Sequence, residues 1–161
     1  MPFTKYQLDT PISPDPHAIA AALRDRIASG ERQFAAIAPD AAAKPLAPGK
    51  WSTQQVLGHL IDSAHNNLQR LIRLQLTDEL DFPGYQQVDW VRLQRFDLLP
   101  WPAVVSLWLT LNRHFAHTIQ HADPAAFAHI WLHDGDRLAL GFILVDYIGH
   151  LDHHLRQLPG Y

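Results

Sequence analysis

The sequence contains no cysteine among its 161 residues. Disulfide bonds, thiolate metal sites and a cysteine nucleophile are therefore excluded for this stretch of chain. Any metal ion must be held by nitrogen or oxygen ligands, and any thiol that takes part in a reaction must arrive with a substrate. The composition suits a reducing compartment, and we expect a cytoplasmic protein.

The sequence also lacks a long apolar run and a large excess of charge. Its longest apolar run, Leu138 to Ile148, is broken by Gly141 and Asp146 and is well short of the ~20 apolar residues that a membrane span needs. The formal net charge is -3 with neutral histidines, which gives no electrostatic footprint for nucleic acid or an anionic membrane. The first residues show no apolar core of signal-peptide length. We therefore expect a small-molecule substrate, with neither nucleic acid nor a membrane as partner.

Four stretches of the sequence repeat apolar residues at helical spacing. A chain of this length suits one domain and can bury a core without disulfides or a metal. We therefore predict a single all-α domain over residues 1–161, built as a four-helix bundle. The predicted helices run over about Pro16–Ala38, Ser52–Thr77, Trp101–His121 and Leu138–Leu158.

Two of the predicted helices begin with local sequence signals. Asp15 is a candidate N-cap for the first helix, with Pro16 as the first helical residue. Ser52 followed by Gln55 is a capping-box pattern, and Trp51 is placed to act as a hydrophobic staple. These signals predict where the first and second helices start.

The connection between the second and third predicted helices, roughly Asp78–Pro100, is long. We expect it to be irregular, and irregular connections of this length are often functional. Tyr85 and Trp90 within it are candidates for a lid over a site. Burial as ordinary core is the alternative for both side chains.

The connection before the last predicted helix, Ala125–Asp136, contains the turn dipeptide Asp134-Gly135. Residues 130–132, just before this turn, favour an extended segment. Because this connection and the preceding one are both long enough to cross the bundle, a simple up-down-up-down order is not required.

Histidines lie on the polar stripes of the second and fourth predicted helices. His150 and His154 are four residues apart, so their imidazoles point the same way from successive helical turns. His59, on the second helix, is available as a third ligand. Three neutral imidazoles with an open fourth position form a metal site of catalytic type, and zinc or nickel would suit it. The alternative is chance spacing in a chain with eleven histidines, with both stripes facing water.

A second group of histidines competes for the same interpretation. His114, His117 and His121 share one face of the third predicted helix. Gln120 and Asp123 are close by, and the group lies near the helix end. These surroundings favour a surface face, and we interpret the group as solvent-exposed.

The sequence resembles the DinB superfamily of helical-bundle metalloproteins, within it the YfiT-like branch. The strongest likeness joins a Lys-Trp-Ser opening to a His-Leu-Ile-Asp-Ser stretch, and a His-x-x-x-His motif in the last helix. The matching segments are residues 49–52 with 56–63, residues 85–90 with 101–114 more loosely, and residues 147–158. The resemblance extends over nearly the whole chain, from about residue 6 to residue 158.

This resemblance implies an up-down-down-up bundle with long crossovers, often a homodimer. It implies His59, His150 and His154 as the three metal ligands. It also implies an enzyme that uses its metal to activate a small thiol or water, as an S-transferase or a hydrolase. A low-molecular-weight thiol is then a possible second cofactor. Trp101, Trp108 and Leu109 are candidates for apolar contact between subunits or for the core.

Further residues on the two stripes have candidate roles. Asp62 and Asp146 share the faces of the histidines and are candidate acceptors that orient the ligand imidazoles. Asn66, Arg70 and Arg73 are candidates for binding a substrate or a thiol cofactor, because guanidinium groups pair with carboxylates. A solvated pair, or salt bridges to a neighbouring helix, is the alternative for the two arginines.

Two alternatives remain open at this stage. Asp152 is another possible acceptor for an imidazole, but it does not share the ligand face, and we discount it. The competing hypothesis for the whole chain is a non-catalytic metal-binding or stress-response module. A closed site with a fourth protein ligand, such as His153, would favour that hypothesis.

Overall fold

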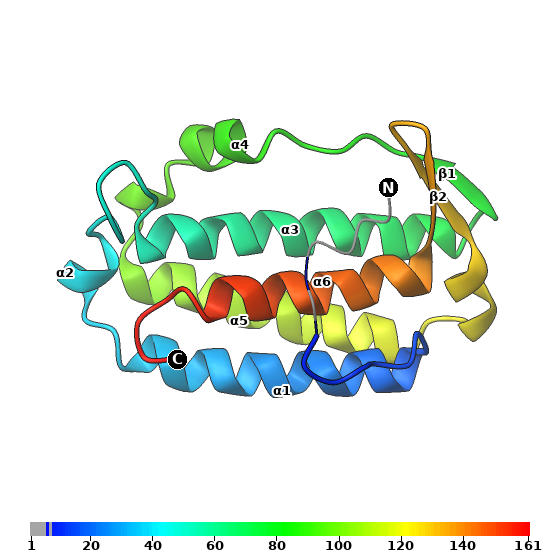
Figure 1. Ribbon diagram of the computed structural model, residues 1–161, viewed down its shortest axis with the longest axis horizontal. Coiled ribbons are helices and arrows are strands. Elements are labelled where there is room, and N and C mark those ends of the chain that lie inside the picture. Colours follow the sequence, from blue (N-terminus) through cyan, green and yellow to red (C-terminus); the bar gives the residue numbers. More distant parts are fainter. Residues whose placement is uncertain (1–5, 7) are drawn as a thin grey trace.

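The computed structural model describes Tyr6 and residues 8–161. Four long helices form a bundle, as the sequence predicts, with a small sheet at one end (Figure 1). The long helices are α1 (Pro16–Ala35), α3 (Thr53–Leu74), α5 (Trp101–Gln120) and α6 (Leu140–Leu155).

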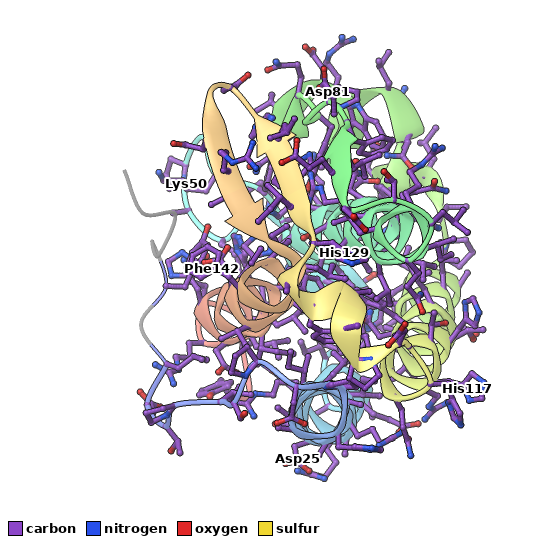
Figure 2. All side chains as sticks on the ribbon, turned by 90° about the vertical axis from the view of Figure 1, so that its right-hand side faces the viewer. Asp25, Lys50, Asp81, His117, His129 and Phe142 are labelled. Carbon is purple, nitrogen blue, oxygen red and sulfur yellow. The ribbon has the colours of Figure 1, made fainter. Side chains whose placement is uncertain are left out.

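The four helices run up-down-down-up. In Figure 1, α3 and α5 both run from left to right, whereas α1 and α6 run from right to left. Each of α1 and α3 packs against both α5 and α6, and the end-on view of Figure 2 shows the four helices at the corners of the bundle. The fold therefore places α3 beside α6 in antiparallel orientation, and these two helices carry the histidine stripes.

Both predicted helix starts are present. The Asp15 carboxylate accepts from the backbone N–H groups of His17 and Ala18. Ser52 and Gln55 form the reciprocal bonds of a capping box, which satisfies backbone donors that the first turn leaves unpaired. The first helix ends at Ala35, three residues earlier than predicted, and Pro39 opens a separate short helix, α2 (Pro39–Ala42).

The long connection between α3 and α5 is not irregular, contrary to the sequence prediction. It contains β1 (Glu79–Asp81), α4 (Gln87–Gln94) and the 3₁₀ helix η1 (Phe96–Leu98). The strand was missed because its hydrogen-bonding partner, β2, is some fifty residues away in sequence. The helix was missed because eight residues are too few for a clear periodic pattern. The connection returns along the outside of α3, so that α5 starts at the same end as α3 (Figure 1).

The connection before α6 forms a hairpin that follows the 3₁₀ helix η2 (Pro124–Ala128). Strands β2 (Ile130–His133) and β3 (Asp136–Ala139) are antiparallel, and β1 pairs with β2 in parallel. Asp134 and Gly135 both have positive φ, at 49° and 87°, as a two-residue hairpin turn requires. The extended segment and its turn are confirmed. The last helix starts at Leu140 instead of Leu138, because Leu138 and Ala139 pair with β2.

The core lies between the four helices and includes three residues that the sequence left as possible subunit contacts. Trp108 is fully buried, and Trp101 and Leu109 are buried as well. Trp108 and Trp101 both stack edge-on against Phe34 of α1. These residues therefore stabilise the bundle and do not form an exposed surface for dimerisation. None of the described helices is both long and apolar enough to span a bilayer.

Candidate metal centre

Three histidines converge between α3 and α6. His59 comes from α3, and His150 and His154 come from successive turns of α6. One ring nitrogen from each lies within 4.8 Å of the others. The Nε2 atoms of His59 and His150 are 2.9 Å apart. The structure thus brings together the three residues that the sequence selected, although His59 and His150 are 91 residues apart in the chain.

Burial keeps these imidazoles neutral. His59 is 1% exposed and His150 is 8% exposed. Burial, together with the neighbouring imidazoles, lowers the pKa of His59 and of His154 to about 4 and the pKa of His150 well below its usual value. Neutral imidazole is the form that binds a metal ion. Near pH 7 the group therefore offers three lone pairs without a prior loss of protons.

The surroundings of the three rings fit a metal ion. Nitrogens bonded to one tetrahedral zinc at ~2.0–2.1 Å lie about 3.3 Å apart, close to the separation of the two Nε2 atoms. The Ser63 hydroxyl lies 3.2 Å from Nδ1 of His150, which leaves Nε2 of that ring for the ion. Trp51 packs on the His59 ring with centroids 5.5 Å apart. Three nitrogen donors and no thiolate suit zinc or nickel equally.

A cavity of about 500 Å³ adjoins the histidine group. His150 lies in its wall, so the cavity opens directly beside one of the three histidines. The rest of the wall comes from the N-terminal segment, α3, the connection before α4, the start of α4, the hairpin and α6. The lining residues include Tyr6, Ser63, Asn67, Arg70, Tyr85, Trp131, His133 and Asp146. A site of this size holds a small molecule.

The two aspartates predicted to orient the imidazoles lie close to the ligands in sequence but have other surroundings. Oδ1 of Asp62 accepts from Gln94 of α4 at 2.6 Å. Its Oδ2 atom and Oδ1 of Asp146 are buried and have no partner among the described residues. Burial raises the pKa of both carboxyl groups to about 6. Asp146 lines the cavity, whereas Asp62 lies under α4.

The three predicted substrate-binding residues have separate positions. Arg70 is buried and lines the cavity, with its guanidinium carbon 3.8 Å from the centre of the Trp131 ring. Asn66 is buried and donates to the backbone carbonyl of Asp62. Arg73 is exposed, bonds to Gln69 and lies over the Phe82 ring. Only Arg70 of the three contributes to the cavity wall.

The competing histidine group is on the surface. His114, His117 and His121 are all exposed, and Figure 2 shows His117 projecting outward from α5. The His121 ring packs on the His117 ring and bonds to the His117 backbone carbonyl at 2.8 Å. The described residues contain no metal-binding arrangement that includes these three, which agrees with the sequence interpretation.

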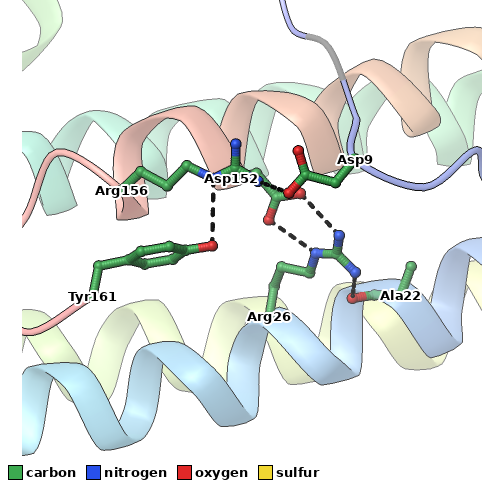
Figure 3. Close-up of polar contacts among 6 residues, drawn as sticks. All are labelled: Asp9, Ala22, Arg26, Asp152, Arg156 and Tyr161. Atoms are coloured by element: carbon green, nitrogen blue, oxygen red, sulfur yellow. Dashed lines mark hydrogen bonds and ion pairs between the residues drawn. The ribbon is translucent and has the colours of Figure 1, made fainter.

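Asp152, which the sequence analysis discounted, belongs to a different network. It pairs with Arg26 of α1 through two hydrogen bonds, of 3.0 and 2.8 Å. Figure 3 shows this pair beside a second contact, in which Arg156 bonds to Asp9 and Tyr161. The network ties α1 to α6 and to both ends of the described chain, away from the ligand face.

Several cavity residues were missed by sequence reasoning. Tyr6 packs on the rings of His150 and His153, at 5.2 and 5.0 Å, and Trp131 stacks on His133 at 4.5 Å. Their positions depend on the fold of the N-terminal segment and of the hairpin. Asn67 alone had an available signal, because it is four residues after Ser63 on the same helix. Of the two lid candidates, Tyr85 lines the cavity and stacks on the half-exposed Trp90.

Residues 31–158 match the DinB superfamily. The chain belongs to this superfamily. A DinB-type bundle is also the fold of YfiT from Bacillus subtilis, which is described as a probable metal-dependent hydrolase with an unusual four-helix bundle topology. That structure superposes with a TM-score of 0.76 over 97% of this chain and 91% of YfiT, at 20% identity.

Two other proteins are similar to this DinB chain. A mycothiol-dependent maleylpyruvate isomerase has the same TM-score, 0.76, over 94% of this chain and 62% of its own, at 14% identity. At these identities the two structures show the shared fold alone. A protein of Oceanobacillus iheyensis named "Putative metal-dependent hydrolase" is 26% identical over 112 residues, which are 68% of this chain and 64% of that protein.

Proposed function

We propose that this protein is a metal-dependent enzyme whose three histidines hold one divalent ion beside the cavity, where a nucleophile attacks a small substrate. The observation that carries the proposal is the convergence of three neutral imidazoles, two buried and one half-buried, of which His150 lies in the wall of a cavity of about 500 Å³. A metal held by three neutral ligands lowers the pKa of a bound water or thiol toward neutrality. Zinc and nickel are the metals that the donor set favours.

The residues around the proposed site have roles that the chain itself can supply. Ser63, by its contact with Nδ1 of His150, keeps that ring in the orientation that directs Nε2 to the ion. The unpartnered Oδ1 of Asp146 can accept the proton that the nucleophile gives up. Asp62 accepts a hydrogen bond from Gln94. This bond joins α4 to α3, the helix that carries His59. Tyr85 and Trp131 contribute aromatic side chains to the cavity wall.

Hydrolysis, with water as the nucleophile, is the first candidate reaction. The relative from Oceanobacillus iheyensis carries the name of a metal-dependent hydrolase, and YfiT is described in the same terms. His150 lines the cavity, and no fourth His, Asp or Glu joins the group among the described residues; hydrolytic metal sites keep such an open position. His153, the residue considered as a fourth ligand, is exposed and bonds to Gln157.

Thiol transfer is the second candidate, and one observation favours it. The chain has no cysteine, and its cavity contains the buried cation of Arg70. An incoming small thiol with an anionic group would find in Arg70 a partner for that group.

We also propose that the protein is a homodimer, as the family resemblance implies.

Assays of the purified protein separate the candidates. The metal-loaded protein, the chelated protein and the variant His154→Ala should be tested against esters and amides without thiol, and against electrophiles with a panel of small thiols. Metal-dependent turnover without thiol supports hydrolysis, and turnover that requires a thiol supports transfer. Metal binding without turnover across both panels would favour the non-catalytic module.

A further inference from the structure

Arg70 is a buried cation without a protein counter-ion. Arg70 is 7% exposed, and within the described chain no carboxylate forms an ion pair with its side chain. Nη1 donates to Oδ1 of Asn67 at 2.9 Å, whereas Nε is buried and has no hydrogen-bond partner. A buried charge normally requires a partner, because removal from water is costly.

This guanidinium, which lines the cavity, has donor atoms that no described residue uses. One face of the group stacks on Trp131, which fixes its plane. Asn67 occupies Nη1, so the Nε and Nη2 edge is the one without a bond in the described chain. Side-on pairing along such an edge gives two parallel hydrogen bonds to a planar carboxylate. Burial lowers the pKa of Arg70 to about 10, which leaves it charged at neutral pH.

The position of Arg70 along α3 sets its distance from the level of His150. Ser63, Asn67 and Arg70 all line the cavity, and their spacing of four and three residues places them on one helix face. Ser63 contacts Nδ1 of His150, so it marks the level of His150, the histidine of the group that lines the cavity. Arg70 is seven residues further along, which corresponds to about 10 Å of helix. The cavity wall thus includes His150 at one level of α3 and Arg70 about 10 Å further along the helix.

We propose that the cavity selects substrates with a carboxylate about 10 Å from the atom that reacts, and that Arg70 binds this carboxylate while the reacting atom lies beside His150. The inference rests on the proposed function, since the reacting atom is placed by the metal. The carboxylate belongs either to the molecule that is cleaved or to an incoming thiol, and both sources share the same receptor. Arg70 is a binding residue that selects the substrate.

The test measures binding and requires no turnover. Straight-chain dicarboxylates from succinate to sebacate are titrated into the zinc-loaded protein by calorimetry, with octanoate as a control for chain hydrophobicity. We expect affinity to increase sharply at suberate to sebacate, whose carboxylates can span the distance from the level of His150 to Arg70. Arg70→Gln and Arg70→Lys should each lose at least tenfold of that affinity, because both lack the two-donor edge. Arg73→Gln is the matched control and should bind as the wild type does.

A second measurement keeps the test decisive if the Arg70 variants fold poorly. The Nε–H resonance of Arg70 in the wild-type protein should shift on addition of azelate and should not shift with a neutral diol of equal length. Equal affinity for all chain lengths, unchanged binding in folded Arg70→Gln, or an unmoved resonance would each overturn the proposal. A metal-loaded protein that binds the dicarboxylates but turns over nothing would contradict the proposed reaction and leave this receptor in place.

The source of the carboxylate follows from kinetics once a reaction is found. If the carboxylate belongs to the cleaved molecule, Arg70→Lys raises the KM for that substrate and leaves the KM for a thiol unchanged. If it belongs to the thiol, the effects are reversed. An equal KM for every substrate in Arg70→Lys and the wild type would overturn the assignment of Arg70.

Discussion

Two groups of three histidines in this molecule each include histidines one helical turn apart, but the two groups have opposite surroundings. His114 and His117, with a third on the next turn, lie on one exposed helix. His59 and His150, with His154, come from two antiparallel helices and are largely buried beside a cavity. Spacing along one helix aligns side chains but does not make them converge. Convergence needs a second helix at the right distance, and burial keeps the nitrogens neutral and free of competing water.

The largest difference between the two groups should appear in metal content. We expect about one divalent ion per chain for the wild-type protein. His59→Ala, His150→Ala and His154→Ala should each remove most of it, since two remaining imidazoles hold an ion poorly. His114→Ala and His117→Ala are the matched controls and should keep full occupancy. Elemental analysis after dialysis measures the metal content per chain. Full occupancy in the first three variants, or loss in the controls, would reverse the assignment.

The buried group should also make the metal-free protein sensitive to acid. Burial lowers the pKa of His59 to about 4, against ~6.5 for an unfolded histidine. As pH falls from about 6.5 to 4, the unfolded chain gains a proton that the folded chain does not, and stability decreases. For this one side chain the loss is on the order of 3 kcal/mol. His59→Gln should remove that part of the pH dependence, whereas the exposed control His114→Gln should keep it.

Two buried carboxyl groups act in the opposite direction. Burial raises the pKa of Asp62 and Asp146 to about 6, so their contribution to stability is present at low pH and is lost as pH rises from about 4 to 6. The variants should therefore be compared with the wild type at each pH, by urea unfolding with a chelator present. Identical pH curves for His59→Gln and His114→Gln would contradict the burial of a neutral His59.

A smaller effect should follow from the hydroxyl beside His150. Ser63 orients this ring through Nδ1, and loss of such a partner weakens metal binding by about tenfold. Thr118→Ala is the control beside the exposed group, because the Thr118 hydroxyl bonds only to the backbone carbonyl of His114. Competition with a zinc chelator measures both affinities. Equal affinities for Ser63→Ala and Thr118→Ala would show that Ser63 does not hold the ligand ring.

The smallest expected effect concerns the association of two subunits and whether the exposed histidines lie in their contact. The family resemblance predicts a homodimer, and light scattering should then give about twice the chain mass of 18.3 kDa. We expect His117→Glu to leave that mass unchanged, because the exposed group belongs to neither the core nor the metal site. A monomeric wild type would contradict the predicted dimer. Dissociation by His117→Glu would place the exposed group in the subunit contact.

The sequence predicted the parts of the structure that depend on local pattern. The four helices, the capping box at Ser52 and the turn at Asp134 all follow from residues close together in the chain. The small sheet did not follow, because β1 pairs with β2 across a long stretch of sequence. Helix α4 was missed because its eight residues include only a weak apolar pattern.

In the candidate site, too, local pattern predicted some features and missed those that depend on distant parts of the chain. Helical spacing selected His150 with His154 and offered His59 as the third ligand, the resemblance implied the same three residues, and the fold brings them together. Arg70 and Arg73 looked equivalent on the wheel, yet only Arg70 meets Trp131 of the hairpin, and Arg73 is exposed. A helix wheel gives the direction of a side chain but not what covers it, so the cavity wall could not be predicted from spacing.

X-ray absorption at the edge of the bound metal measures the ligand shell of the ion itself. We expect three imidazole nitrogens at ~2.0–2.1 Å for zinc, with the remaining coordination filled by a light atom that small anions can displace. The spectrum of His117→Ala should be identical to that of the wild type, and His150→Ala should lose the three-imidazole pattern. A shell of four imidazoles, or an unchanged spectrum in His150→Ala, would contradict a metal centre open to the cavity at His59, His150 and His154.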